Sequence, residues 1–286
     1  MIDIIIPCYN AHDTLDKTLQ SILIQSIKDK VNILIVDDKS DKDYKSVISK
    51  YKKLLNIKVT RLRKNMGPGQ AREIGISKTS SKYIVFLDSD DIFVASDSLE
   101  LLYNTIEKGY DYVNSIEYDQ KRKHYFILNG NLHGKIYRRD YIINNNIHFN
   151  DSRYHEDNFF NNYVILSGAK RYTLSQCTYF YVENTTSLTN SIKNELDTLE
   201  IYLENMKELL NITLSNNYPK YNLITFMEEK YGYLRRLYRY TSGKDKETII
   251  KLIKKYDKDL LEYIDLEKKQ FKKEIYDYLS NLYLYK

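Results

Sequence analysis

The sequence contains no tryptophan and only two cysteines, Cys8 and Cys177, among its 286 residues. Two cysteines are too few for a disulfide scaffold or a cysteine metal site, so we expect a reducing compartment. No stretch approaches the roughly 18 uninterrupted apolar residues of a membrane-spanning helix. The N-terminus lacks a basic leader, and its apolar run stops at Pro7, unlike a secretory signal. These absences predict a cytoplasmic protein, with peripheral contact at the inner face of the membrane as an alternative.

A strong charge of either sign is also missing. The chain has 44 Lys and Arg against 39 Asp and Glu, which leaves a net charge of +5. This mild excess permits contact with anionic substrates or lipid head groups without requiring nucleic acid. The length allows one large domain, or a domain with an appendage, around a substantial core.

Apolar runs alternate with segments of helical spacing through the first third of the chain. The pattern predicts strands at 2–6, 31–36, 57–62 and 83–87, and helices between them at 14–27, 43–54 and 69–77. Buried strands that alternate with helices predict an α/β fold with a mostly parallel sheet flanked by helices. In such sheets, ligands bind beyond the carboxyl ends of the strands.

The pattern changes after the fourth predicted strand. It predicts a helix at 99–109, strands at 110–116 and 124–128, a short helix after 134–140, and a helix that Asp157 opens and Gly168 ends. From Lys193 onward helical spacing dominates, with breaks at 216–219 and 241–244. We therefore predict two regions, an α/β domain over 1–191 and a C-terminal α-helical appendage over 192–286.

Polar residues follow each of the first four predicted strands, at 7–10, 37–40, 63–70 and 88–91. We expect these four clusters to share one rim of the sheet. Asp88 and Asp90 are two residues apart, so in an extended chain both carboxylates project to the same side. Carboxylates held in this way suit Mg²⁺ or Mn²⁺, which commonly bind phosphorylated substrates.

Five strings in order strongly resemble the inverting glycosyltransferases of family 2, which have the GT-A fold. The strings are IIIPCYNAHDTLDKTLQSI, ILIVDDKS, NMGPGQAREIGI, YIVFLDSDD and YHEDNFF, and the resemblance covers roughly residues 1–190. It implies a nucleotide-sugar-binding catalytic domain with Mn²⁺ or Mg²⁺ as cofactor. The implied reaction moves a sugar from a UDP-sugar to a hydroxyl of a glycan or lipid-linked glycan acceptor.

The resemblance implies nucleotide-sugar contacts at Pro7, Tyr9, Asp38, Gly67, Arg72, Asp88 and Ser89. Tyr9 would stack on uracil in a loop that Pro7 shapes, and Asp38 would accept a hydrogen bond from the base. Arg72 would hold the diphosphate, for which its planar fork of donors is suited. Each residue also has an ordinary interpretation: Tyr9 covers the sheet edge, Asp38 caps a turn with Ser40, Arg72 forms a surface ion pair, and Gly67 makes a turn.

Asp88 and Asp90 match the D-x-D motif of the family. The resemblance implies that Asp90 binds the metal directly and that Asp88 lies nearer the ribose or a metal-bound water. Asp157 matches the catalytic aspartate, which would take the proton from the acceptor hydroxyl as that oxygen attacks the anomeric carbon. Alternatively, Asp157 or Glu156 only caps its helix. His133 is either a further metal or phosphate contact or, as is more common, a hydrogen-bonded structural residue.

Other functions are less well supported by the sequence. The missing tryptophan excludes the tryptophan-containing motif of processive synthases, which favours single addition, and Tyr181-Val182 departs from the Tyr-Arg of many relatives. A sugar nucleotidyltransferase needs a glycine-rich basic loop after the first strand, which PCYNAHD does not provide. Two alternatives stay open: a non-catalytic scaffold whose basic, aromatic segment 233–240 binds a polyanion, and a transferase acting on modified DNA. For 192–286 we expect acceptor binding, membrane-surface contact or homo-oligomer formation.

Overall fold

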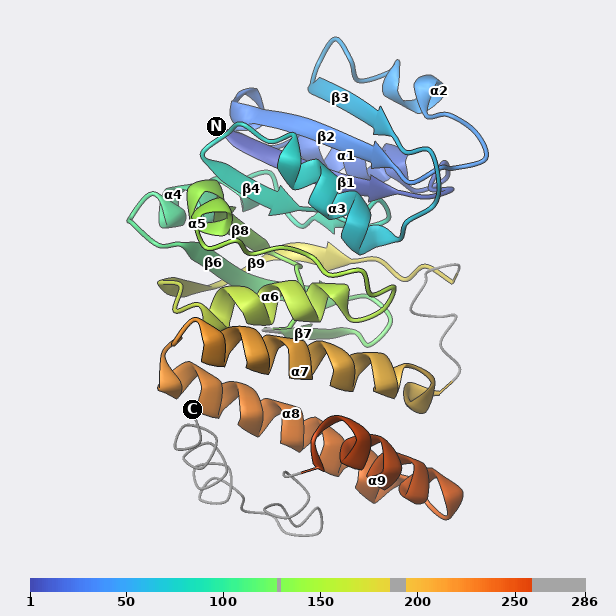
Figure 1. Ribbon diagram of the computed structural model, residues 1–286. Coiled ribbons are helices and arrows are strands. Elements are labelled where there is room, and N and C mark those ends of the chain that lie inside the picture. The colour runs from blue at the N-terminus through green and yellow to red at the C-terminus, as the bar shows by residue number, and fades with distance from the viewer. Residues whose placement is uncertain (128–129, 186–193, 259–286) are drawn as a thin grey trace. The chain divides into compact units, whose positions relative to one another are not determined.

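The structure is a computed structural model that describes residues 1–127, 130–185 and 194–258 (Figure 1). The chain divides into two compact units. The first unit comprises residues 1–161 and 169–185, and the described part of the second comprises 162–168 and 194–258. The predicted domain boundary at 191 falls outside the described residues and stays a prediction.

Among the described residues, one mixed sheet of nine strands forms the centre of the first unit (Figure 1). The strands are β1 (Ile2–Cys8), β2 (Val31–Asp37), β3 (Asn56–Arg61), β4 (Tyr83–Phe86), β5 (Ile92–Phe93), β6 (Tyr112–Asp119), β7 (His124–Phe126), β8 (Lys135–Arg138) and β9 (Arg171–Tyr181). Their order is β3-β2-β1-β4-β8-β6-β9-β5, and β7 pairs with β6. Strands β1 to β4 run parallel, as the alternating pattern predicts, whereas β8 is antiparallel to β4 and β6.

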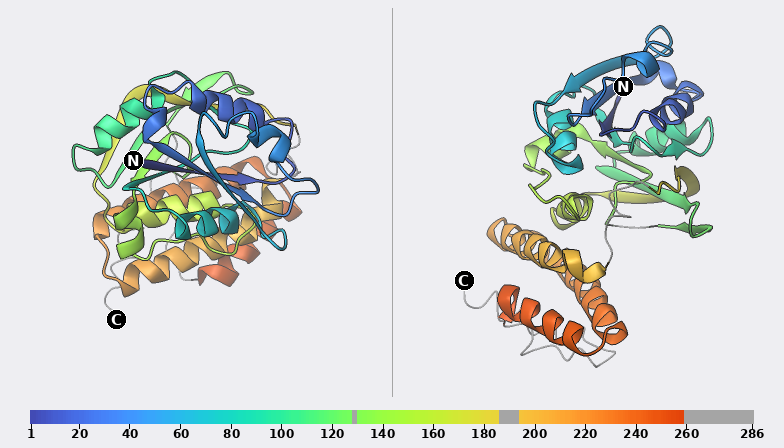
Figure 2. Two further views of the ribbon diagram at one scale, coloured as in Figure 1. Left: turned by 90° about the horizontal axis from the view of Figure 1, so that it is seen from above. Right: turned by 90° about the vertical axis from the view of Figure 1, so that its right-hand side faces the viewer.

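Helices cover both faces of this sheet (Figure 2). They are α1 (Leu15–Leu23), α2 (Lys45–Ile48), α3 (Pro68–Ser77), α4 (Ser98–Ile106), α5 (Arg139–Asn144) and α6 (Glu156–Leu166), whose last residues belong to the second unit. The alternation of β1 explains the layers. Ile4 packs in the core formed with α1 and α4, whereas Ile5 faces α3, where a Cβ on Gly75 would lie 2.5 Å from its Cγ2.

The helix predicted over 43–54 is wrong in extent, because only α2 is helical and turns follow it. Tyr51 is buried, and its hydroxyl donates to the carbonyl oxygen of Asp16 at 3.0 Å. This tertiary contact with α1 decides the local backbone in place of the helical pattern. The sequence does not predict β5, β8 and β9. β5 is two residues long, β8 is a four-residue strand with a charged residue at each end, and β9 carries exposed polar residues at its start.

The second unit consists of helices α7 (Leu199–Ser215), α8 (Lys220–Tyr240) and α9 (Lys244–Tyr256), together with the end of α6. The breaks between them lie where the sequence predicts them. Arg236 and Arg239 of α8 are exposed, whereas Leu234 and Leu237 are buried, as in an ordinary amphipathic helix. No helix in the described part of the chain is long and apolar enough to cross a membrane.

Candidate functional site

The loops after β1 and β2 are joined at the carboxyl ends of these parallel strands. The backbone N–H of Asn10 donates to Ser40 Oγ at 2.9 Å, and the N–H of Ser40 donates to Asp37 Oδ1 at 2.8 Å. Tyr9 lies between these contacts and the end of β1, and 52% of its surface is exposed. The tyrosine ring is therefore available to a ligand while its backbone is held in place.

Asp38 connects the end of β2 to the start of α3. Its Oδ1 and Oδ2 accept hydrogen bonds from the backbone N–H groups of Met66 (2.7 Å) and Gly67 (2.8 Å). Gly67 has a φ of +86°, which a residue with a side chain rarely adopts. Asp38 is buried, and burial raises its pKa. Asp38 therefore caps the turn at 66–67 and not, as the sequence suggested, a turn with Ser40. Each of its carboxylate oxygens keeps a second lone pair, which can accept a hydrogen bond from a further donor.

Three acids follow β4 within four residues, and the structure gives them different surroundings. Asp91 is buried, and it accepts hydrogen bonds from Tyr179 Oη (2.6 Å) and Val182 N (2.8 Å). Asp90 Oδ2 accepts from Asn184 Nδ2 at 2.7 Å. Burial raises the pKa of both acids, and their negatively charged neighbours raise it further. The cluster therefore favours the binding of a cation.

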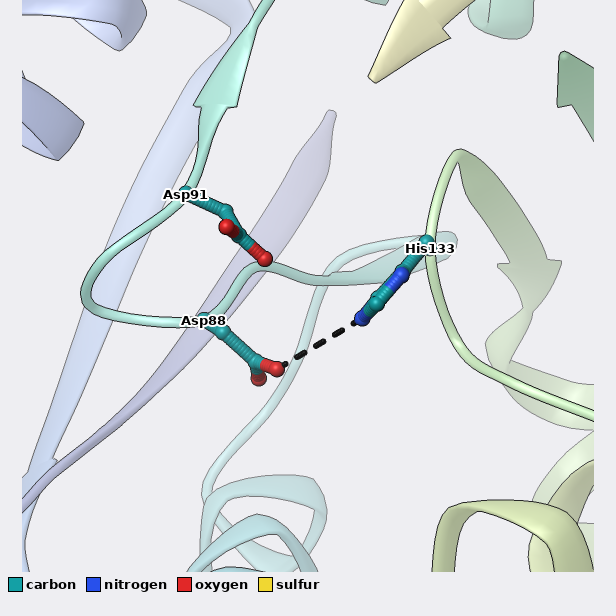
Figure 3. A group of neighbouring side chains, drawn as sticks. All are labelled: Asp88, Asp91 and His133. Atoms are coloured by element: carbon teal, nitrogen blue, oxygen red, sulfur yellow. Dashed lines mark ion pairs between the residues drawn. The ribbon is translucent and has the colours of Figure 1, made fainter. Parts of the chain in front are cut away.

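His133 faces this cluster from the loop before β8 (Figure 3). Its Nε2 lies 3.7 Å from Asp88 Oδ2, and its Nδ1 lies 2.6 Å from Glu117 Oε2. The imidazole also stacks on Tyr179, with 4.6 Å between the ring centroids. Burial opposes protonation, but the contacts with Asp88 and Glu117 outweigh it and raise the pKa of His133 to about 10.

Asp88, Asp91 and His133 form a group that fits a divalent cation. One ligand atom from each residue lies within 4.8 Å of the others, and Figure 3 shows the three side chains directed into one space. Carboxylate oxygen and imidazole nitrogen suit Mn²⁺. A carboxylate on the other ring nitrogen, here Glu117, is the usual support of a metal-binding histidine. Asp90, which the sequence predicts as the direct ligand, is outside this group.

Arg72 lies on α3 and links the acidic cluster to the start of α6. Its Nη2 donates to Asp88 Oδ1 at 2.6 Å, and its Nη1 donates to Glu156 Oε1 at 2.9 Å. Arg72 is only 4% exposed. Burial would raise the pKa of Asp88, but the adjacent guanidinium holds it well below its usual range. Arg72 thus forms a buried ionic bridge, not the surface ion pair that the sequence offered as an alternative.

Asp157 lies in the first turn of α6, which begins one residue earlier than predicted, at Glu156. Its Oδ1 accepts from the N–H of Asn158 at 2.7 Å. The negative charge of Asp157 favours the protonated forms of Arg72, Glu156 and Lys135. The polar residues after β1, β2 and β4 follow the carboxyl ends of parallel strands, and Arg72 joins Asp88 to the start of α6.

Sequence reasoning did not single out Glu117, Asn131, Lys135 and Asn184. Glu117 is a buried acid within β6, and it binds both His133 and Asn131 Nδ2 (2.7 Å). Lys135 Nζ donates to Asn131 Oδ1 at 2.7 Å, and burial lowers its pKa to about 7. β6 (YVNSIEYD) mixes apolar and polar residues, so the sequence held no distinct signal for Glu117. Ser89 is half-buried, and its hydroxyl lies beside the buried Cys8 thiol.

Comparisons with known proteins give the site its context. Residues 3–155 match the family described as Glycosyl transferase family 2. The minor teichoic acid biosynthesis protein GgaA of Bacillus subtilis (strain 168) is 30% identical over 217 residues, which cover 63% of this chain and 47% of that protein. Poly(ribitol-phosphate) beta-N-acetylglucosaminyltransferase TarS of Staphylococcus aureus (strain MW2) is 23% identical over 255 residues, or 81% of this chain and 44% of that protein. The chain thus spans about half the length of these curated relatives.

Solved structures show a similar fold. S. aureus TarS 1–349 in complex with UDP-GlcNAc has a TM-score of 0.75 at 18% identity, covering 99% of this chain and 90% of that one. The mannosyltransferase PcManGT from Pyrobaculum calidifontis, in complex with GDP-Man and Mn²⁺, has a TM-score of 0.57 at 11% identity, covering 100% and 88%. These likenesses confirm the predicted α/β fold of the GT-A type with a C-terminal helical part.

Proposed function

Because the chain belongs to glycosyltransferase family 2, we propose that it transfers a sugar from a UDP-sugar to a hydroxyl of a glycan or lipid-linked glycan. What supports this proposal is that Asp88, after β4, contacts His133 and is joined through Arg72 to the start of α6. Tyr9 is exposed after β1, the parallel neighbour of β4. Sugar transfer needs an aromatic surface for the nucleobase of the donor, a cation site for its diphosphate, and a general base that takes the proton from the acceptor hydroxyl. All three lie in the first unit.

For the donor, we assign the uracil to the exposed ring of Tyr9, with Asp38 accepting from the base. We also assign donor contacts to Gly67, in the turn before α3, and to Ser89; Pro7, predicted to shape the loop, lies within β1. UDP-GlcNAc is the first donor to test, because TarS has been solved with it. Poly(ribitol phosphate) is the first acceptor to test, because the name of that relative contains it. For residues 192–286, acceptor binding, membrane-surface contact and homo-oligomer formation all stay as proposals.

For the cofactor, we assign Mn²⁺ or Mg²⁺ to Asp88, His133 and Asp91, with Asp90 as the alternative carboxylate. When bound, such an ion neutralises the charge that develops on the departing nucleoside diphosphate. Hydrogen bonds fix the three side chains in position. Arg72 binds Asp88, Glu117 orients the imidazole of His133, and the Tyr179 hydroxyl binds Asp91.

For catalysis, we assign the proton transfer to Asp157. Its carboxylate would take the proton from the acceptor hydroxyl as that oxygen attacks the anomeric carbon. Asp157 lies in the first turn of α6, next to Glu156, which Arg72 holds in place. One displacement of this kind inverts the anomeric centre, so an α-linked donor gives a β-linked product.

Replacing Tyr9 by Ala should weaken UDP binding. Stacking of a base on an aromatic ring contributes about 1–3 kcal/mol, so the Kd for UDP should rise about 5–150-fold. Isothermal titration of UDP measures this change. Tyr221→Ala, at an exposed tyrosine of the second unit, is the matched control. An unchanged Kd in Tyr9→Ala would remove the uracil from the assigned position.

Replacing Glu117 by Gln should weaken metal binding without removing a metal ligand. Glu117 orients His133 through the 2.6 Å contact with Nδ1, and losing such a partner costs about 10–100-fold in metal affinity. Titration of Mn²⁺ followed by electron paramagnetic resonance gives the affinity directly. Glu183→Gln, at an exposed residue after β9, is the control. Equal affinities in both variants would separate His133 from the metal.

The proposed activity itself is tested by incubating the protein with UDP-sugars and Mn²⁺ in the absence of acceptor. Family 2 chemistry predicts slow release of UDP from the correct donor, and EDTA should suppress it. Coupled detection of UDP identifies the donor sugar. A protein that neither binds nor turns over any UDP-sugar contradicts the proposal.

A further inference from the structure

Helix α3 is hydrogen-bonded to the segment that leads into α6 and to the first residue of α6. Arg72 Nη1 donates to Glu156 Oε1 at 2.9 Å. The N–H of Phe149 donates to Glu73 Oε2 at 2.9 Å, and Gln70 Nε2 donates to the carbonyl oxygen of Asn150 at 3.2 Å. These contacts join residues about 80 positions apart in sequence, so α3 sets where α6 begins.

Gly69 allows the closest approach between the two segments. A Cβ at this position would lie 2.7 Å from Glu156 Cγ and 3.0 Å from Glu156 Cβ. Its φ is not in the left-handed region, so glycine is required here for space rather than for backbone conformation. Glu156 therefore packs directly on the backbone of α3, and Asp157 follows it in the same turn of α6.

Both terminal nitrogens of the Arg72 guanidinium bind carboxylates in this arrangement, whereas the buried Nε has no hydrogen-bond partner among the described residues. One Nη atom binds Glu156, the other binds Asp88, and the Phe149 ring centroid lies 5.9 Å from its central carbon. Arg72 is only 4% exposed. A diphosphate that reached these buried Nη atoms would compete with Asp88 and Glu156 for them, and a Glu156 carboxylate without its partner would be left buried.

We propose that Arg72 is a positioning residue that fixes the separation between Asp88 and the catalytic turn of α6, and does not bind the donor diphosphate. This inference rests on the proposed function, because it assigns the donor to the side of Asp88 and the base to Asp157. The planar fork of arginine spans two carboxylates at once, whereas lysine offers a single point charge. Glu156 transmits the position to Asp157 through one peptide unit.

Arg72→Met and Arg72→Lys test the inference when donor binding and transfer are measured separately. Misplacing a reacting group by about 1 Å lowers the reaction rate about 10²-fold, so kcat for transfer should fall by about the same factor. Titration in EDTA removes any metal, so the ratio of the UDP affinity to the uridine affinity then reports only contacts between the protein and the diphosphate. If Arg72 makes no such contact, this ratio should stay within about threefold of the wild-type ratio. Arg139→Met is the control, because Arg139 Nε donates to Thr79 Oγ1 beyond the other end of α3.

Gly69→Ala supplies a second variant that leaves the ionic bridge chemically intact. Its Cβ should displace Glu156 and lower kcat while the UDP-to-uridine ratio stays unchanged. If the Arg72 variants do not fold, Gly69→Ala alone tests whether the position of Glu156 affects kcat. A UDP-to-uridine ratio that falls about tenfold or more in Arg72→Met, or wild-type kcat in Gly69→Ala, overturns the positioning role. Failure of the wild-type protein to bind UDP is a different result, which removes the proposed function and this inference with it.

Discussion

Replacing Asp157 by Asn should lower kcat for sugar transfer by about 10²–10⁴-fold, the range that a positioned general base contributes. The amide keeps the size of the side chain but cannot accept the proton of the acceptor hydroxyl. Binding of UDP should be unchanged, because Asp157 is assigned to the acceptor side. Steady-state transfer rates and titration of UDP together separate the two effects.

Asp151→Asn is the matched control for this experiment. Asp151 is an exposed aspartate in the segment that leads into α6, so the same isosteric change tests the loop without touching the base. We expect wild-type rates in this variant. Full transfer activity in Asp157→Asn would show that Asp157 has only a structural role in the first turn of α6. Another residue would then have to act as the base.

Replacing Asp88 by Asn should lower transfer by about 10²–10³-fold, the cost of removing one electrostatic group that stabilises charge in the transition state. The residual rate should be the same with Mn²⁺ and with EDTA. Asp88 is the acid that faces His133 and also binds Arg72, so its loss affects both the cation site and the ionic bridge. Removing one partner from a buried ion pair is destabilising, so the thermal unfolding midpoint should fall as well.

Two further variants interpret the Asp88 result. Asp97→Asn, at an exposed acid between β5 and α4, should leave both metal dependence and rate unchanged. Asp90→Asn compares the two carboxylates of the D-x-D motif by Mn²⁺ titration. Loss of Mn²⁺ binding in Asp90→Asn, with binding retained in Asp88→Asn, would favour the ligand predicted from the sequence over the group formed by Asp88, Asp91 and His133.

The first four strands and their shared rim could be predicted from the sequence because the responsible signals are local. β1 and β4 are short apolar runs, and parallel strands joined by helices place their carboxyl ends together. The polar residues that follow each run therefore gather without any knowledge of individual contacts. The resemblance to family 2 then supplied roles for particular residues, including Tyr9 and Asp157.

The supporting contacts of the site could not be predicted, because they join residues that are distant in sequence. Glu117 meets His133 across β6 and the loop before β8, and Arg72 meets Glu156 across 84 positions. The hydrophobic periodicity of the sequence carries no information about such pairs. The residue type of Arg72, for example, suits a diphosphate, and only its burial between two carboxylates indicates a different role.

In the proposed donor complex, Tyr9, Asp38, the Asp88–His133 pair and Asp157 surround one nucleotide. A crystal structure of the protein soaked with UDP and Mn²⁺ tests this arrangement most directly. The account predicts uracil against the ring of Tyr9, the diphosphate and Mn²⁺ beside Asp88 and His133, and Asp157 open toward the vacant sugar position. UDP bound on another surface, or Mn²⁺ bound away from Asp88 and His133, would contradict it.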